Sequence, residues 1–345
     1  MIINNDKEIK LNKTKKSMEE LFNLFNYKIN EIKENNNNRI KELKKKNEGK
    51  QKIINLYINK YNKLENKYNK LEQLIYGIDD NIKEKYKNKI NLIYTVDKED
   101  VYNIFGAAFV RVNKNNIELN INGNKCNLLS KYKLKKGLNN ITMIIKNKIR
   151  DLKKMFYECG NLNNIEDLQY LNTKYCNNFS YMFFNCWELE KLKGLENWNV
   201  SNGINFEKMF NGCSKLTEIQ ALENWNVSSG VNFSYMFSNC FNLSDIKALG
   251  KWKVSNGNDF SFMFYNCAQL SDIKALEKWD ISRGELFSFM FCECVSLSDI
   301  EPLRNWKILK EQNYIGFFFK CPNLLNIKVL EKWEKKKIVN MFNGY

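Results

Sequence analysis

The segment NFSYMFSNC at residues 232–240, followed by Leu243, Ile246, Leu249 and Trp252, decides the fold of this chain. Close copies of it recur every 27 residues, and each copy has a cysteine at the same place. These cysteines are Cys159, Cys186, Cys213, Cys240, Cys267, Cys294 and Cys321. A fixed period of this size indicates one structural unit that is repeated and stacked. The sequence therefore predicts a surface for holding partners rather than a catalytic pocket.

The spacing inside one repeat predicts two elements. Phe233, Met236, Phe237 and Cys240 follow the pattern i, i+3, i+4, i+7, which is typical of one face of a short helix. The preceding Asn232 is a suitable N-cap. After the cysteine, apolar residues fall at every third position, which favours an arc with a short strand near Ile246.

We therefore expect an α/β solenoid of leucine-rich-repeat type, with a short parallel strand and a short helix in every 27-residue coil. The repeats occupy residues 151–345, as seven coils and a truncated C-terminal cap. Residues 90–150 read as a small β module that covers the first coil, because β-branched residues alternate with polar ones and Asn122-Gly123 is a hairpin-turn signal. Strands are also expected over residues 90–96, 101–112 and 141–146, and Gly106 suits a bulge or tight bend in the second of these.

Residues 1–89 are interpreted as a helical, coiled-coil-like arm. Its apolar residues recur with spacings of three and four, which predicts a seam that must be buried on something. The seam consists of Tyr57, Tyr61, Leu64, Tyr68, Leu71, Ile75, Ile78 and Ile82. Self-association through this seam and an antiparallel hairpin within one chain are the two open alternatives.

The charge distribution bears on possible partners. The formal net charge is +16, yet residues 151–345 hold 22 basic and 22 acidic side chains, so the excess lies in the first 150 residues. A basic N-terminal half suits a nucleic-acid partner, although interspersed charges are also typical of ordinary solvated faces. Nucleic-acid association is kept as an alternative function.

Catalysis and metal binding are not expected. The chain contains no histidine, which is the usual general base near neutral pH and the commonest metal ligand. One cysteine per coil does not supply the converging pairs of a zinc site, so the thiols are interpreted as structural. We therefore predict no enzyme, no catalytic residue, no metal and no cofactor.

The outward side chains beside the predicted strand form the candidate binding face for a protein partner. They are Asp245, Lys247, Asp272, Lys274, Asp299 and Glu301. If Ile246 points inward, its two charged neighbours face outward, where repeat proteins commonly bind. The alternative is that these charges only keep the sheet hydrated.

The pattern Met-Phe-x-x-Cys-x-x-Leu with a downstream Asn-Val-Ser resembles the BspA-like leucine-rich-repeat family of bacterial and protist surface proteins. The resemblance covers residues 151–345 and implies a right-handed protein-binding solenoid. Surface members carry export signals, whereas no signal peptide or long apolar run is found in this sequence. We therefore expect an intracellular interaction scaffold located in the cytoplasm, and keep an adhesin-like protein exported without a classical signal as an alternative.

Overall fold

The structure, a computed structural model, describes residues 88–306, 312–325, 327–333 and 335–343. All of them belong to one unit of the chain, Glu84–Tyr345. The seam from Tyr57 to Ile82, and with it the predicted coiled-coil arm, lies outside the described residues. Its self-association stays a prediction.

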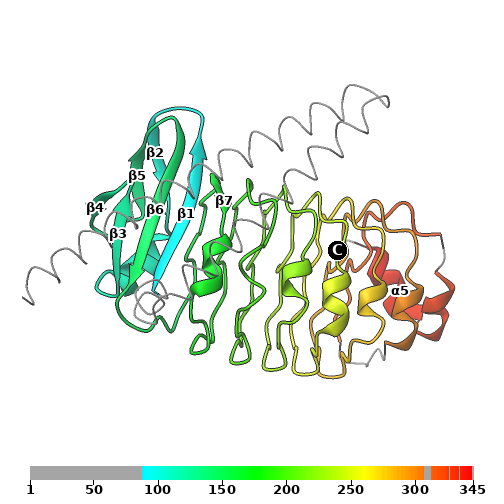
Figure 1. Cartoon of the computed structure of the whole chain (residues 1–345). Helices are drawn as coiled ribbons and strands as arrows, with labels where there is room; N and C mark the ends of the chain where they lie inside the picture. The colour runs from blue at the N-terminus through cyan, green and yellow to red at the C-terminus, as the bar shows by residue number, and fades with distance from the viewer. Residues whose placement is uncertain (1–87, 307–311, 326, 334, 344–345) are drawn as a thin grey trace, which may run out of the picture. The chain divides into compact units, whose positions relative to one another are not determined.

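The module that precedes the repeats contributes four strands to a five-stranded antiparallel sheet, and the first repeat contributes the fifth (Figure 1). The strand order of the sheet is β4-β3-β6-β1-β7. The strands are β1 (Lys89–Val96), β3 (Ile117–Ile121), β4 (Asn124–Cys126), β6 (Gly137–Ile145) and β7 (Leu162–Asn164). In β1 every second side chain is buried, as its alternating sequence requires.

Two predictions for this module have different outcomes. The hairpin turn is confirmed, because Asn122 and Gly123 both have positive φ, 50° and 85°, and join β3 to β4. The strand expected over residues 101–112 is wrong in its second half. The first residues of this segment belong to strand β2 (Asp100–Asn103), which pairs with β5 (Lys131–Leu134). The later residues form helix α4 (Ala107–Asn113) instead of a strand.

The β module is joined directly to the first repeat. Strand β7, which belongs to that repeat, pairs with β1. Close by, the rings of Phe105 and Phe156 lie 5.9 Å apart. Gly106 donates its N–H to the Met155 carbonyl, and a Cβ at Gly106 would lie 2.0 Å from the Lys154 carbonyl oxygen. The glycine therefore permits a close backbone approach rather than the bulge that its position in a strand suggests.

Backbone hydrogen bonds connect each repeat to the next. The N–H groups of Phe233, Tyr235 and Phe237 donate to carbonyls of the following repeat, at Asp259, Ser261 and Met263, over 2.8–2.9 Å. Isolated parallel β-bridges join equivalent residues 27 apart, such as Asn205 and Asn232. Equivalent side chains of successive repeats therefore line up, and we call each such line a column.

The predicted α/β solenoid of leucine-rich-repeat type is wrong. The strands that form sheets are antiparallel, and the described residues hold few helices. Within the described residues the repeats contribute single parallel bridges instead of a parallel sheet, and no α-helix recurs once per repeat. The fold is better described as an antiparallel β module followed by repeats of turns and short 3₁₀ segments.

Positive φ angles explain why the predicted helix does not form. Tyr235 has φ 56° and Asn239 has φ 59°, and a right-handed helix cannot contain such residues. Successive turns form instead, with the N–H of Met236 bonded to Phe233 and that of Cys240 bonded to Phe237. Asn232 does not cap a helix, because its Oδ1 accepts the N–H of Ser234, two residues on.

The predicted strand around Ile246 is also replaced by other structure. Ile246 has φ −116° and ψ 19° and precedes a 3₁₀ segment. The 3₁₀ segments are Glu166–Tyr170, Gln220–Leu222, Lys247–Lys251, Lys274–Leu276, Glu301–Asn305 and Lys328–Lys332.

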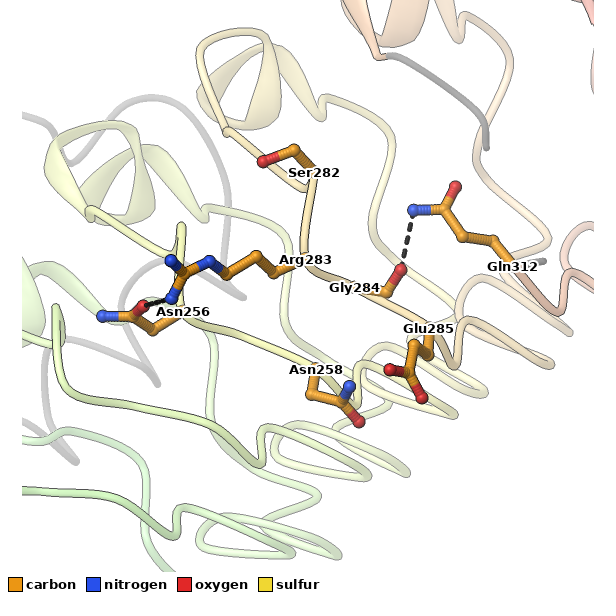
Figure 2. A pocket seen from close by; sticks show the side chains of 7 residues that line it. All are labelled: Asn256, Asn258, Ser282, Arg283, Gly284, Glu285 and Gln312. Carbon is orange, nitrogen blue, oxygen red and sulfur yellow. Dashed lines mark hydrogen bonds between the residues drawn. The ribbon is translucent and has the colours of Figure 1, made fainter. Parts of the chain in front are cut away.

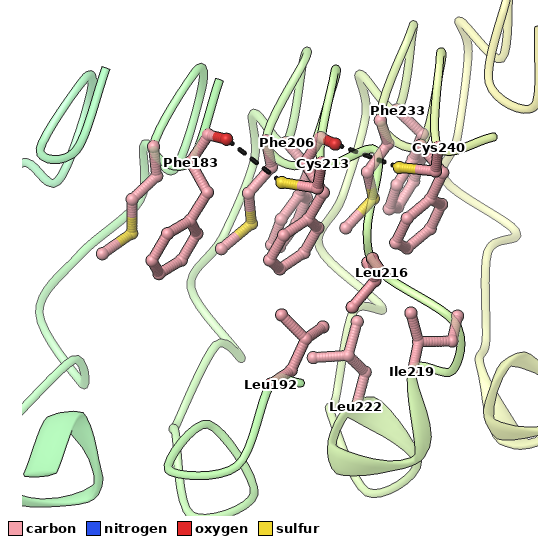
Figure 3. Packing of buried hydrophobic residues seen from close by; sticks show 14 of the residues in the cluster. Phe183, Leu192, Phe206, Cys213, Leu216, Ile219, Leu222, Phe233 and Cys240 are labelled. Carbon is pink, nitrogen blue, oxygen red and sulfur yellow. Dashed lines mark hydrogen bonds between the residues drawn. The ribbon is translucent and has the colours of Figure 1, made fainter. Parts of the chain in front are cut away.

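Columns of apolar side chains fill the interior (Figure 3). The rings of Phe206, Phe233 and Phe260 stack in parallel at 5.4–5.5 Å, and each is fully buried. Trp252 is nearly buried as well, and its Nε1–H donates to the Leu222 carbonyl at 2.9 Å. Every repeat therefore adds the same side chains to one continuous core.

Helix α5 (Lys335–Phe342) follows the last described repeat (Figure 1). Met341 at its end is fully buried, and its carbonyl accepts the N–H of Phe318 at 2.8 Å. In the preceding repeats, Phe264 makes the same bond to Met290. Met341 therefore continues the backbone pairing of the repeat methionines.

Candidate functional site

The six predicted binding-face residues occupy equivalent positions of successive repeats but do not converge on a site. Ile246 is 2% exposed, Lys247 is exposed and Asp245 is half-buried. Asp245 Oδ1 accepts the N–H of Lys247 at 2.8 Å, and its Oδ2 lies 3.3 Å from the Lys247 Nζ. The aspartate therefore holds the start of the 3₁₀ segment of its own repeat.

The same local bonds recur in the next two repeats. Asp272 Oδ1 accepts the N–H of Lys274 at 2.8 Å, and Asp299 Oδ1 accepts that of Glu301 at 2.9 Å. Glu301 forms an ion pair with Arg304. The three aspartates thus have a structural role, because each accepts a backbone N–H of its own repeat. The exposed ion pairs beside them contribute little to stability. Their use as a binding face stays a prediction.

The cysteine column lies inside the protein. Cys213 Sγ donates to the Phe183 carbonyl at 3.3 Å, and Cys240 Sγ donates to the Phe210 carbonyl at 3.2 Å (Figure 3). Burial raises the pKa of the Cys240 thiol from 9.0 to about 12. All ten cysteines are free thiols. Because the thiolate is the reactive form, this column is poorly suited to nucleophilic or redox chemistry.

A shallow polar depression lies at another edge of the repeats, near Arg283 (Figure 2). Arg283 Nη1 donates to Asn256 Oδ1 at 2.6 Å, and Gln312 Nε2 donates to the Gly284 carbonyl at 2.7 Å. Both bonds connect one repeat to a neighbouring one, so they hold the repeats together. Among the described residues, no three Cys, Asp or Glu side chains are placed to hold a metal ion.

An outer column of aromatic and lysine side chains was not foreseen from the sequence. It consists of the residues directly before each Met of the Met-Phe pairs. Tyr235 and Phe262 stack with ring centroids 4.4 Å apart, and Phe262 and Phe289 stack at 4.9 Å. The Lys208 ammonium lies 4.5 Å from the centre of the Tyr235 ring, on the other side. The faces of these rings are therefore covered by their neighbours.

The composition around this column changes along the chain. In residues 153–215 the column and the outer positions next to it carry seven charges, namely Lys153, Lys154, Glu158, Glu188, Glu207, Lys208 and Lys215. In residues 234–296 the same positions carry serine, asparagine, glutamine, aromatic and other apolar residues. The one charge there is Glu293, which pairs with Lys320 at 2.7 Å.

We call this second part the aromatic patch. It consists of Tyr235, Phe241, Phe262, Tyr265, Phe289 and Val295. Phe241 and Val295 are 42% and 41% exposed, and the other four are half-buried. Tyr265 contacts Phe262 edge to face at 5.7 Å. Aromatic residues with few charges are typical of the centre of a protein-binding surface, and aromatic residues with serine and asparagine are typical of antibody binding loops.

The sequence contained a signal for this patch. The residues before the methionines of the repeats run Lys, Tyr, Lys, Tyr, Phe, Phe, and these large side chains do not fit the buried spacing of Phe, Met and Cys. Outward aromatic residues at a fixed place in successive repeats indicate an exposed row.

These features define a repeat protein whose successive repeats are joined by backbone hydrogen bonds. A family model described as "Mycoplasma protein of unknown function, DUF285" matches residues 127–247 and 240–345. The chain belongs to this family. No curated protein and no solved structure matches the chain. In the described part of the chain, no helix has the length and hydropathy needed to span a bilayer.

Proposed function

We propose that this chain is a non-enzymatic scaffold that binds a protein partner through the aromatic patch. The main support is the change in the composition of the outer side chains between residues 153–215 and 234–296, within one continuous series of repeats. In the first part the outer positions hold seven charges around the exposed Trp187, whereas in the second part Phe241 and Val295 are exposed among serine and asparagine, with Glu293 as the one charge. Interface centres have this depletion of charge and enrichment of aromatic residues.

The rigidity of the frame supports the proposal. Phe262 and Phe289 are fixed by stacking, and the backbone beside them is bonded to the next repeat at Ser288 and Ile315. Binding therefore requires little ordering of side chains, which is one of the main costs of association.

A relationship to the BspA-like surface proteins is part of this proposal. Its support is the repeat Met-Phe-x-x-Cys-x-x-Leu, together with the downstream Asn-Val-Ser at Asn199 and Asn226. The binding of a protein partner does not depend on this relationship.

The test uses the immobilised full chain and a cell extract, with quantitative mass spectrometry of the captured proteins. The variant Phe241→Ser/Val295→Ser removes both exposed anchors, and Asp272→Asn/Lys274→Gln is the matched control on the charged face. We expect the first variant to lose a specific partner by about tenfold or more, since each anchor of an interface centre contributes more than about 1 kcal/mol. Equal capture by the wild type and the first variant contradicts the proposal.

A further inference from the structure

Five neighbouring segments form an edge of the protein that contains no acidic side chain, and we call it the acid-free edge. They are residues 111–116, 146–150, 172–177, 199–204 and 226–231. The first two are in contact, because Lys146 donates its N–H to the Asn116 carbonyl at 2.8 Å. The second is in contact with the third, since the Lys148 ammonium lies 4.7 Å from the centre of the Tyr175 ring.

The last three segments are turns of successive repeats and are joined by hydrogen bonds. Asn202 Nδ2 donates to the Lys174 carbonyl at 2.8 Å, and Ile204 donates its N–H to the Asn177 carbonyl at 2.9 Å. Val231 in turn donates its N–H to the Ile204 carbonyl, also at 2.9 Å. The acid-free edge is therefore continuous from the β module to the repeats.

Positive charge is concentrated in the first three of these segments. Their exposed basic residues are Arg111, Lys114, Lys146, Lys148, Arg150 and Lys174. Two acidic residues border the segments, namely Glu118, which pairs with Lys146, and Asp151, whose Oδ1 accepts the N–H of Lys153. Residues 88–150 hold 12 basic and 4 acidic side chains, so the surrounding β module does not offset the charge. The edge therefore attracts an anionic partner.

Apolar side chains are exposed along the same edge. Val112, Tyr175, Ile204 and Val231 are 62%, 45%, 48% and 40% exposed. Surfaces that lie on membranes combine basic residues, which bind anionic headgroups, with apolar residues that enter the boundary of the acyl chains. Tyrosine is typical of the level of the headgroups, because its ring is apolar and its hydroxyl is polar.

Other anionic partners fit this composition less well. Single-stranded nucleic acid stacks its bases on exposed aromatic rings, whereas Tyr175 is the one aromatic residue of the edge and Lys148 covers one face of its ring. The exposed valine and isoleucine side chains have no counterpart on a phosphate backbone, which is bound by polar groups. Interfaces between proteins are depleted of lysine, and most of the basic residues here are lysines.

We propose that the acid-free edge binds the surface of a membrane that contains anionic lipids. The basic side chains contact the headgroups, and Val112, Ile204 and Val231 enter the boundary of the acyl chains. The proposal goes beyond the scaffold function and does not depend on the aromatic patch, since none of the residues of that patch lies in the edge.

The experiment measures how much of the full chain sediments with lipid vesicles. One kind of vesicle contains phosphatidylglycerol and phosphatidylcholine in equal parts, and the other contains phosphatidylcholine alone. We expect binding to the anionic vesicles to be at least about tenfold stronger and to weaken as the salt concentration rises. Equal binding to both kinds of vesicle overturns the proposal.

A single-stranded oligonucleotide tests the alternative partner. It is added to the chain and the anionic vesicles at a phosphate concentration equal to that of the anionic lipid. We expect the chain to stay on the vesicles. If the oligonucleotide removes it, the edge is a site for nucleic acid and the proposal is wrong.

Two triple variants with the same change in net charge locate the contact. The edge variant is Lys148→Gln/Arg150→Gln/Lys174→Gln. The control is Lys131→Gln/Lys135→Gln/Lys136→Gln. Its exposed side chains lie on strand β5 and in the turn that joins β5 to β6. We expect the edge variant to bind at least about tenfold more weakly than the control, since each basic residue near an anionic surface contributes about fivefold. Equal binding by the two variants overturns the proposal.

The apolar contact is tested by Ile204→Ser/Val231→Ser. Its control is Val101→Ser/Leu129→Ser, which changes two exposed apolar residues outside the edge. We expect the first variant to bind the anionic vesicles about fivefold more weakly than the wild type, and the control to bind equally well. Undiminished binding by the first variant overturns the proposal.

Thermal unfolding by circular dichroism shows whether each variant is folded. If a combined variant does not fold, its single variants decide, and undiminished binding by all of them overturns the proposal. Phe241→Ser/Val295→Ser should bind the vesicles like the wild type. If it loses them as strongly as the edge variant does, the contact lies elsewhere and the proposal is wrong, whatever its effect on capture of a protein partner.

Discussion

The thiol of Cys240 donates a hydrogen bond to the carbonyl oxygen of Phe210, which lies thirty residues earlier in the chain and 3.2 Å away. The same bond recurs between Cys267 and Phe237, also at 3.2 Å. Each thiol thus bonds one repeat to the preceding one while it fills part of the core. A small side chain with a weak donor suits this place.

Chemical labelling is expected to separate the buried cysteines from Cys126. Cys240 is fully buried, whereas Cys126 at the end of strand β4 is partly exposed. A buried thiol reacts only when the structure opens. Iodoacetamide at pH 8 should therefore modify Cys126 first, with the repeat cysteines unlabelled over the same time, as read by peptide mass spectrometry. Cys126→Ser should abolish the fast reaction, and rapid labelling of Cys240 would contradict the structure.

Stability is expected to fall at alkaline pH because of the same column. The pKa of Cys240 is raised from its ordinary 9.0 to about 12 by burial, and that of Cys321 to about 11. Below pH 9 the thiols are protonated in both states, and the stabilisation is complete. As the pH rises from 9 towards 12, only the unfolded state loses protons, so the free energy of unfolding falls. Each thiol contributes about 1.4 kcal/mol per pH unit.

Urea unfolding between pH 8 and pH 11 measures this dependence. Cys240→Ala is the control, because it removes one titrating thiol and so reduces the slope with pH, whatever its effect on stability at pH 8. If the free energy of unfolding does not change between pH 9 and pH 11, the cysteines are not buried as the structure shows.

Much of the repeat geometry follows from the sequence because every repeat must bury the same residues. Ile246, Leu249 and Trp252 follow the three-residue spacing of apolar side chains in the repeat, and the structure buries all three. The 27-residue period also places Asp245, Asp272 and Asp299 at equivalent positions. The 27-residue period does not specify the backbone conformation between the buried residues.

The predicted helix failed because its spacing of three and four residues is also produced by successive turns. Those turns need left-handed residues, and Tyr235, Phe262 and Phe289 occupy that region with φ of 56–58°. Large side chains rarely adopt such a conformation, so nothing at these positions suggested it. The weak signals were Gly316, at the position equivalent to Tyr235, and Gly212, at the position equivalent to Asn239, which both have positive φ. The aromatic patch was missed for the same reason, since it is built on these turns.

Replacement of Trp252 by phenylalanine should destabilise the protein by about 1–3 kcal/mol. The change removes the hydrogen bond from Nε1 to the Leu222 carbonyl, at 2.9 Å, and leaves a space beside a nearly buried ring. The Leu222 carbonyl still accepts the N–H of Trp225, which keeps the cost moderate. Trp187→Phe is the matched control, because Trp187 is 47% exposed. Chemical unfolding of both variants measures the difference, and equal loss of stability would be inconsistent with the structure.

Asn239 has the left-handed backbone conformation, with φ 59°, so the effect of a substitution there on stability can be predicted. Valine is strained in this region because of its branched Cβ, so Asn239→Val should lower the free energy of unfolding by about 1–3 kcal/mol. Glycine adopts positive φ without strain, so Asn239→Gly should change it by no more than about 0.5 kcal/mol. Gly212 has φ 75° at the equivalent position of the preceding repeat, which supports the second expectation. Urea unfolding of the two variants is the measurement. If valine is tolerated as well as glycine, the residue does not have a left-handed conformation and the turns between Phe233 and Cys240 are of another kind.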